Sequence, residues 1–87
     1  MVSTVMGGRR SAIEIVRDIL SLCNGGEVNK TTIMYRSNLS YHQLGKYLSL
    51  LSGQGLIDKN DDGRFQITKH GQKTLRQASS LIKTLRP

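Results

Sequence analysis

The residues of this 87-residue chain that suit a specific chemistry are its lysines and arginines, and they are unevenly distributed. The chain has 13 Lys and Arg against 6 Asp and Glu, a formal net charge of +7. Residues 1–62 carry seven basic and six acidic side chains, whereas residues 63–87 carry six basic side chains and no acidic one. A basic excess gathered in one segment favours a polyanionic partner, either nucleic acid or an anionic membrane surface.

No group of residues has the types and spacing that catalysis or metal binding needs. Cys23 is the only cysteine, and helical periodicity predicts it on a buried face, where a structural thiol is expected. His42 and His70 have no carboxylate or cysteine at ligand spacing, and no glycine-rich phosphate loop follows a strand. We therefore expect no catalytic residue, no metal, no cofactor and no small-molecule substrate.

The composition also predicts where the protein works. A single cysteine cannot form an internal disulfide, which favours a reducing compartment. No apolar run approaches the roughly 18 residues of a membrane span. Residues 1–10 lack the apolar stretch of a signal peptide. We expect a cytoplasmic, nucleoid-associated protein that does not bind membranes.

Three helices are predicted in the first two thirds of the chain. Residues 11–14 (Ser-x-x-Glu) and 40–43 (Ser-x-x-Gln) are capping boxes, each typical of a helix start. The first helix ends before the glycine pair at 25–26, and the second covers residues 30–37. The third begins at the second capping box and runs to about residue 53. Because a short turn joins the second and third helices, the pair matches the helix-turn-helix pattern.

A β-hairpin and a last helix follow. Phe65 and Ile67 alternate with polar residues as in a half-buried strand, and residues 60–63 are turn formers. A helix-turn-helix followed directly by a hairpin is a winged helix, so the fold class is mainly α with a small β-hairpin (α+β). The expected organisation is a flexible tail over residues 1–10, a winged helix-turn-helix domain over 11–68 and an amphipathic C-terminal helix over 69–87.

Several stretches resemble a known family. The sequence KTTIMYRSNLSY at residues 30–41 is similar to the second helix and turn of archaeal winged-helix proteins of the small, ten-kilodalton chromatin-associated class. LSGQGLI at residues 51–57 and ITKHG at residues 67–71 are similar to their wing entry and to the strand-to-helix junction of many winged-helix regulators. The resemblance implies a dimeric, sequence-tolerant DNA-binding protein whose last helix pairs with its counterpart in an antiparallel coiled coil.

The third helix is the predicted recognition helix, since its polar face can meet base edges in the major groove. Lys46 can reach guanine acceptors or a phosphate, Gln43 can read adenine, and Gly45 lets the backbone approach closely. For Tyr41 and Tyr47 we expect core packing rather than base stacking. The predicted DNA-binding residues are Ser40, Tyr41, His42, Gln43, Lys46 and Ser49 on the third helix, Lys30, Thr31 and Arg36 on the second, and Lys59 and Arg64 in the hairpin.

The last helix has a basic face and an apolar face. The apolar residues Leu75, Ala78, Ile82 and Leu85 repeat over two heptads, which favours a short coiled-coil seam between two chains. The same face can instead pack within the chain on the Ile15 and Leu22 edge of the first helix. The resemblance favours the dimer, and both arrangements remain open at this point.

These features favour a weakly sequence-specific, double-stranded DNA-binding protein that is not an enzyme, either a chromatin-type protein or a transcription regulator. An RNA-binding protein would use the same charges, although few aromatic side chains are present to stack unpaired bases. A winged-helix adaptor that binds protein is the third possibility. The acidic pair Asp61 and Asp62 at the wing tip suits it best, because a wing pressed against phosphate would not favour these charges.

Overall fold

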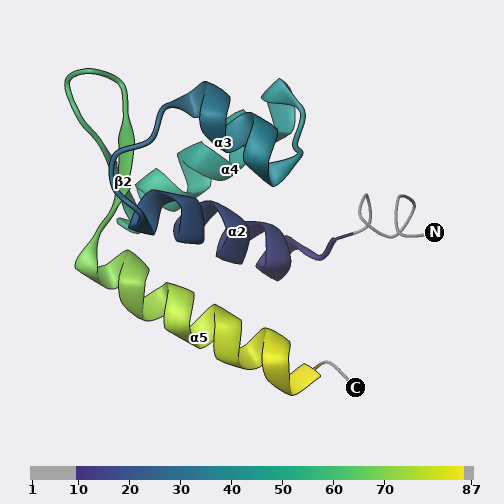
Figure 1. The fold of residues 1–87 in the computed structure, drawn as a ribbon. Helices are drawn as coiled ribbons and strands as arrows, with labels where there is room; N and C mark the ends of the chain where they lie inside the picture. The colour runs from purple at the N-terminus through teal and green to yellow at the C-terminus, as the bar shows by residue number, and fades with distance from the viewer. Residues whose placement is uncertain (1–9, 86–87) are drawn as a thin grey trace.

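The computed structural model describes residues 10–85, which form helices around a small antiparallel hairpin (Figure 1). The elements are α2 (Ala12–Asn24), α3 (Lys30–Ser37), α4 (Tyr41–Gly53), β1 (Ile57–Lys59), β2 (Phe65–Ile67) and α5 (Lys69–Leu85). This order confirms the predicted winged helix-turn-helix with an additional C-terminal helix. The predicted tail, apart from Arg10, lies outside the described residues.

Local hydrogen bonds fix where the helices begin. Ser11 and Glu14 form one capping box and Ser40 and Gln43 the other, each with the side chain of one residue bonded to the backbone of its partner. The turn between α3 and α4 depends on Asn38, which adopts the left-handed conformation at a φ of 57°. Asparagine tolerates this conformation better than most residues, so α3 stops there and α4 can start at a sharp angle.

The wing, defined here as residues 57–67, is a hairpin with a structured turn. Its strands pair with Ile57 opposite Ile67, and Val28 forms an isolated bridge to Phe65 from the loop before α3. The side-chain oxygen of Asn60 accepts hydrogen bonds from the backbone N–H groups of Asp62 and Arg64. The Asn60 bonds shape the turn of the wing, and the Val28 bridge holds the wing against the loop that leads into α3.

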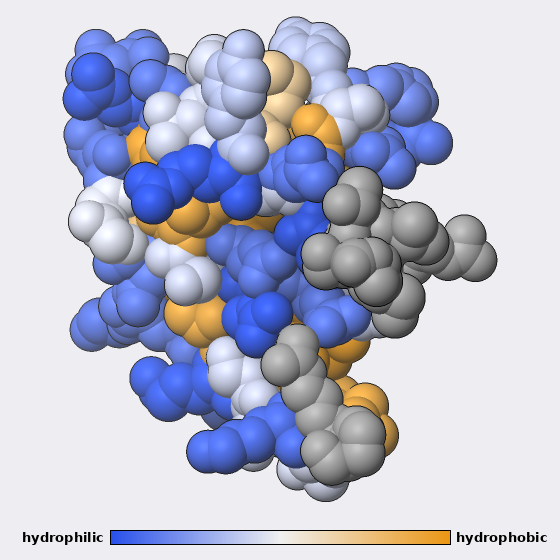
Figure 2. Space-filling model, turned by 45° about the vertical axis from the view of Figure 1, so that its right-hand side comes forward, coloured by the Kyte–Doolittle hydropathy of each residue, from blue (hydrophilic) through white to orange (hydrophobic). Residues whose placement is uncertain are grey.

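The core lies where α2, α3, α4 and the wing meet. Its fully buried side chains include Ile19, Ile33, Leu44 and Ile57, one from each of these elements. On the face shown in Figure 2, hydrophilic side chains cover most of the surface and hydrophobic residues emerge in separate small areas. Within residues 10–85, no helix is long and apolar enough to cross a membrane.

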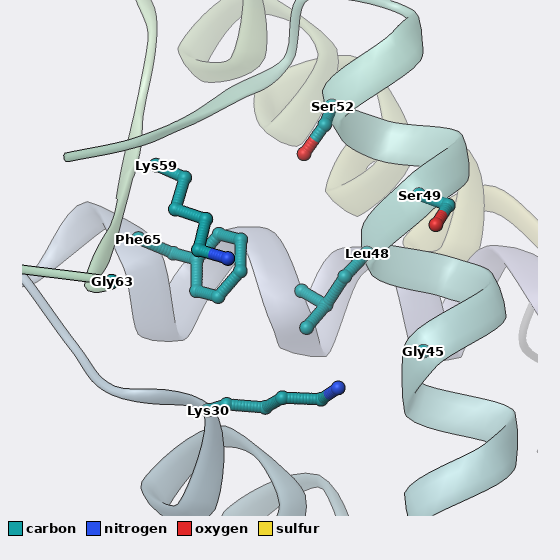
Figure 3. Close-up of a pocket in the computed structure, with 8 residues that line it drawn as sticks. All are labelled: Lys30, Gly45, Leu48, Ser49, Ser52, Lys59, Gly63 and Phe65. Carbon is teal, nitrogen blue, oxygen red and sulfur yellow. The ribbon is translucent and has the colours of Figure 1, made fainter. Parts of the chain in front are cut away.

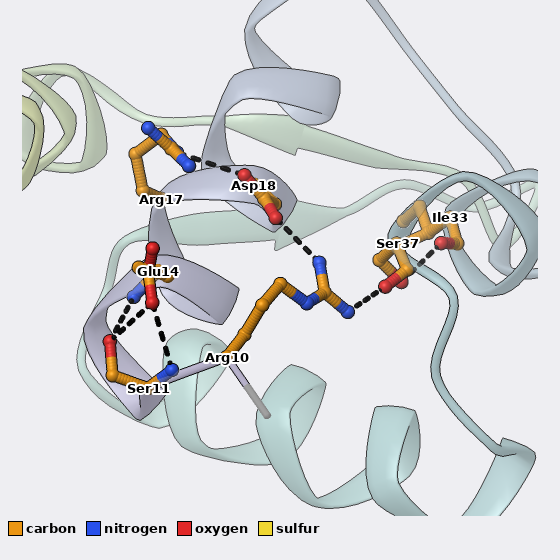
Figure 4. Close-up of polar contacts among 7 residues, drawn as sticks. All are labelled: Arg10, Ser11, Glu14, Arg17, Asp18, Ile33 and Ser37. Atoms are coloured by element: carbon orange, nitrogen blue, oxygen red, sulfur yellow. Dashed lines mark hydrogen bonds and ion pairs between the residues drawn. The ribbon is translucent and has the colours of Figure 1, made fainter. Parts of the chain in front are cut away.

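A partly buried arginine contact joins α2 to the helix-turn-helix (Figure 4). One guanidinium nitrogen of Arg10 lies 2.5 Å from a carboxylate oxygen of Asp18, and the other donates a hydrogen bond to the carbonyl of Ser37. Ser37 is itself fully buried, and its hydroxyl donates to the carbonyl of Ile33 at 2.5 Å. Arg10 therefore ties the start of α2 to the last turn of α3, next to the turn that aims α4.

Helix α5 packs antiparallel on α2. Gln72 near its start bonds to Asn24 at the end of α2, whereas Ala78 borders a groove shared with Ile13 near the start of α2. The contact is close at Gly71, where an added Cβ would lie 2.0 Å from the carbonyl oxygen of Leu56. Glycine at this position is what allows α5 to lie against the base of the wing.

The structure thus shows the packing within the chain that the sequence left open. Ala78 and Ile82 are buried inside the single chain, and Leu75 packs on its core. Leu85 is 69% exposed and Leu81 is 47% exposed. Two of the four residues predicted for a dimer seam are buried and a third, Leu75, is partly buried, so a partner helix would meet mainly the exposed leucines.

Candidate nucleic-acid interface

Helix α4 presents a polar face to solvent, as its pattern predicted. Leu44, Leu48 and Leu51 are buried, and this fixes which side of the helix faces outward. The exposed side carries His42, Gln43, Lys46 and Ser49. Because Ser40 and Gln43 bond to each other's backbone in the capping box, the Gln43 amide oxygen is engaged, while its NH₂ group is left to face solvent.

Beside this face lies a groove of about 290 Å³ between α4 and the wing (Figure 3). Lys30 at the start of α3 and Lys59 at the end of β1 reach from different elements toward the space beside α4. The floor is apolar, and one wall carries small and hydroxyl residues of α4. The lining residues are Lys30, Gly45, Leu48, Ser49, Ser52, Lys59, Gly63 and Phe65.

Aromatic rings hold the two groove lysines. The ammonium of Lys30 lies 4.1 Å from the centre of the Tyr41 ring, and that of Lys59 lies 5.9 Å from the centre of the Phe65 ring. The ion pairs between residues 10 and 85 involve Arg10, Arg17 and Asp18, and neither groove lysine takes part in one. Both ammonium groups therefore keep their charge available for an anion, in positions that the rings restrict.

Tyr41 corrects one prediction. Its side chain is 68% exposed, so the expected packing of Tyr41 in the core is wrong. It is the first residue of α4, directly after the Ser40 cap, and its ring lies beside the Lys30 ammonium rather than in the core. Tyr47 lies one and a half turns further along and does pack against the core cluster, as expected.

Gly45 lies where two hollows meet. It lines the groove, and it also lines a shallower hollow together with Tyr41, His42, Lys46 and Ser49. A Cβ placed on Gly45 would find no atom within 4 Å, so nothing inside the protein requires glycine at this point. Since glycine weakens a helix interior relative to alanine by about 1 kcal/mol, its presence here fits close approach of a ligand.

The remaining predicted residues lie around this centre to different degrees. Thr31 and Arg64 are exposed near the groove elements but do not line it. Arg36 borders a separate hollow with Gly25 and Thr32, so the structure does not bring it to the α4 groove.

The sequence analysis did not include Ser52 and Phe65 among the site residues. The spacing Gly45, Ser49, Ser52 is a four-then-three helical stripe of small residues, and that pattern was the available signal. The place of Phe65 depends on how the wing folds toward α4, which no local pattern specifies.

We also looked among the described residues for a reactive thiol and for a metal site. Burial raises the pKa of the Cys23 thiol to about 11, so little reactive thiolate forms near neutral pH. Within residues 10–85, no group of three or more His, Cys, Asp or Glu side chains is placed to hold a metal ion.

A family model described as winged helix-turn-helix matches residues 9–86. The chain belongs to the winged helix-turn-helix family. Among solved structures, the chain is similar to Sso10a-2 of Sulfolobus solfataricus, a DNA-binding protein, with a TM-score of 0.76 and 28% sequence identity. That match covers 86% of this chain and 81% of Sso10a-2.

Two curated relatives are also archaeal, and both are uncharacterized proteins of Methanocaldococcus jannaschii. The first is 38% identical over 65 residues, which is 75% of this chain and 66% of the relative. The second is 29% identical over 85 residues, 98% of this chain and 40% of the relative. The chain thus spans less than two thirds of either curated relative. The predicted resemblance to small archaeal winged-helix proteins is confirmed.

Proposed function

We propose that this protein binds double-stranded DNA, with α4 in the major groove and a phosphate strand passing along the groove between α4 and the wing. The observation that carries the proposal is the α4 groove, where Lys30 and Lys59 approach an unobstructed helix face from two sides. The similarity to the DNA-binding protein Sso10a-2 supports the same conclusion.

The proposed DNA contacts are of two kinds: contacts with phosphates, which position the protein on the duplex, and contacts with base edges, which depend on the DNA sequence. The start of α4 presents backbone N–H groups beside the Ser40 hydroxyl, a favourable place for one phosphate. Lys30 and Lys59 neutralise further phosphates along the groove, and Thr31 and Arg64 extend this contact at its edges. Base reading is left to His42, Gln43, Lys46 and Ser49.

Sequence discrimination by this surface is weak. Lys46 is the only Lys or Arg on α4, and the Gln43 amide oxygen is held by its capping box. A bidentate contact to adenine needs both atoms of that amide, so Gln43 would have to leave the capping box to make it. A helix with so few free base-reading groups suits a chromatin-type DNA-binding role better than a highly selective regulator.

We also propose that the protein forms a homodimer and that it is associated with the nucleoid. Leu81 and Leu85 are exposed on α5, and Leu81 lines an apolar groove together with Ile13 and Val16 of α2. A second α5 covering these residues would extend the helix packing into a four-helix contact. A DNA-binding protein of this kind would be associated with the nucleoid and would act by binding rather than by catalysis.

Fluorescence anisotropy with a random-sequence duplex at several salt concentrations tests the DNA proposal. We expect a slope of log affinity against log salt between about −4 and −7, as for four to eight neutralised phosphates. Lys46→Gln should weaken binding about tenfold, because a hydrogen bond from a charged donor is lost. Ser21→Glu on α2 is the matched control, since it lowers the net charge by the same single unit outside the groove.

Three results would overturn the proposal. Flat titrations at low salt would leave a protein adaptor as the function. Tighter binding to duplex RNA than to duplex DNA would favour the RNA-binding alternative. Equal losses in Lys46→Gln and Ser21→Glu would remove α4 from the interface.

The molecular mass from light scattering tests whether the protein is a dimer, and variants of exposed residues test where the interface lies. Leu81→Ser with Leu85→Ser should halve the molecular mass without unfolding the chain, because neither leucine is buried. An unchanged dimeric mass would place the interface elsewhere, and a monomeric wild-type protein would exclude the dimer.

A further inference from the structure

The exposed face of α5 carries a row of cations that the α4 site does not use. Lys69, Lys73, Arg76 and Lys83 are all exposed, and they follow one another at spacings of four, three and seven residues. At 100° per residue these positions fall on one side of the helix. The buried residues Gly71, Ala78 and Ile82 lie on the other side.

Within residues 10–85, no ion pair neutralises this row. Residues 63–87 contain no acidic residue, and the ion pairs of the described chain involve α2 and Arg10 only. Neighbouring cations on one helix face repel each other by a few tenths of a kcal/mol per pair. The arrangement therefore weakens the helix unless an external anion neutralises it.

The length and spacing of the row suit a polymer of phosphates. From Lys69 to Lys83 the helix rises about 21 Å, at 1.5 Å per residue. One DNA strand presents a phosphate about every 3.4 Å along the duplex axis while it winds around that axis, so a row of this length can meet several phosphates of one duplex. A small free anion would use only one or two of the four cations.

A membrane surface suits the row less well. An amphipathic helix that lies on a bilayer needs a free apolar face to insert. Most of the apolar face of α5 is covered by α2 and by the base of the wing, as the burial of Gly71, Ala78 and Ile82 shows. Only the basic side of α5 is then free to bind a partner. Contacts between basic side chains and phosphates supply most of the affinity in sequence-independent DNA binding.

The row and the α4 groove point in different directions. In Figure 1, α2 lies between α5 on one side and α3 and α4 on the other. Since the buried side of α5 faces α2, its basic side points away from α2 and from the α4 layer. A straight duplex seated on α4 cannot lie along α5 as well.

We propose that the basic face of α5 is a second DNA-backbone-binding surface, through which one chain holds a second duplex while α4 holds the first. This inference rests on the proposed function of α4. It adds a surface that makes no base contact and so binds any sequence.

A capture experiment tests the second surface. A 16-base-pair duplex is immobilised on beads and loaded with protein, and the retention of a second, fluorescent 16-base-pair duplex is measured. Duplexes of this length resist bending around the protein. Each protein in this experiment carries Leu81→Ser with Leu85→Ser and is checked to be monomeric by light scattering, so that no second α4 face is present. In that background Lys73→Gln with Arg76→Gln should reduce retention of the fluorescent duplex at least fivefold, while protein loading on the beads stays within twofold of the protein with Lys73 and Arg76 intact.

The matched control is Ser21→Glu with Gln54→Glu, two exposed positions outside the row that lower the net charge by the same two units. Retention by this control at the wild-type level supports a localised surface. Equal losses in both variants would overturn the proposal in favour of a general charge effect. Retention unchanged by the α5 variant would also overturn it, because the row would then not be what holds the second duplex.

Two further readouts separate this inference from the proposed function. Wild-type protein that fails to load on the immobilised duplex refutes the α4 proposal, whereas loading without capture refutes only the second surface. Co-sedimentation with anionic phospholipid vesicles tests whether the row binds a membrane surface instead of DNA. Vesicle binding that depends on Lys73 and Arg76, combined with duplex capture that does not, would assign the row to a membrane instead.

Discussion

Helices α4 and α5 each bury one side in the same small domain and present the other to solvent, yet the exposed sides differ in shape and charge. The α4 side borders a groove, carries one lysine and relies on cations from neighbouring elements. The α5 side is a helix surface with four cations of its own. The side with more charge is therefore not the side with the better-shaped groove, and charge counting alone would have selected α5 rather than the helix that we propose for base reading.

Their glycines show the same contrast. Around Gly45 of α4 there is open space, whereas Gly71 of α5 lies against the backbone of Leu56. One glycine leaves room for a partner outside the protein, and the other allows two elements inside it to touch. Substitutions at these two positions should therefore separate binding from folding.

The largest effect is expected for Gly71→Ala. Its Cβ would lie 2.0 Å from the Leu56 carbonyl oxygen and 2.7 Å from Cγ1 of Ile67, so α5 must shift away from the wing. Overpacking of this kind costs about 3 kcal/mol, which lowers the midpoint of thermal unfolding by roughly 15 °C in a domain of this size. Circular dichroism measures the transition, and an unchanged midpoint would contradict the close contact.

The next effect is on DNA affinity. Lys30→Gln with Lys59→Gln removes both groove cations and should weaken duplex binding about 30-fold, with a salt slope less steep by about two. The free energy of unfolding should fall by only about 1 kcal/mol, since neither lysine is in an ion pair and what is lost is two exposed cation–π contacts. Anisotropy titrations measure both quantities, and an unchanged slope would show that no phosphate lies in the groove.

A smaller, two-sided effect is expected for Gly45→Ala. The new methyl group meets no protein atom, so the helix should gain about 1 kcal/mol of stability. The same group narrows the groove, and duplex affinity should fall about fivefold, or roughly 1 kcal/mol. Gly53→Ala, at the other open glycine of α4, is the control that should leave affinity unchanged.

The smallest effect is expected at the wing tip. Asp61→Asn with Asp62→Asn removes two exposed negative charges near Arg64, and duplex affinity should rise about twofold at low salt. The gain should disappear near 1 M salt, where such charges are screened. A loss of affinity would instead show that the acidic tip contributes to the interface.

Much of the fold could be predicted because its signals are local. The two capping boxes and the glycine pair at 25–26 gave the ends of α2 and the start of α4, and alternation gave the strands. The partner of α5 was not predictable in this way, because its apolar face fits a second chain as well as it fits α2. Only the folded chain shows that Ala78 and Ile82 are already covered.

The candidate site likewise has one part that local sequence patterns predict and one part that depends on contacts between elements. The exposed face of α4 follows from helical periodicity, whereas the groove depends on the wing bringing Lys59 and Phe65 beside α4. Tyr41 was misplaced because it was grouped with Tyr47, although one is at the first turn of the helix and the other packs on its buried side. Contacts between elements decided each of these cases.

The junction between the wing and α5 has one consequence for how this chain can change in length. Only Thr68 separates β2 from α5, and its hydroxyl donates to the carbonyl of Gly55 and accepts from the N–H of Gly71. A residue inserted after Thr68 would turn every later side chain of α5 by about 100°, at 3.6 residues per turn. Such an insertion would bring charged positions round toward α2 and apolar ones toward solvent. Relatives with longer chains are therefore expected to place their extra residues elsewhere and to keep this junction at one residue.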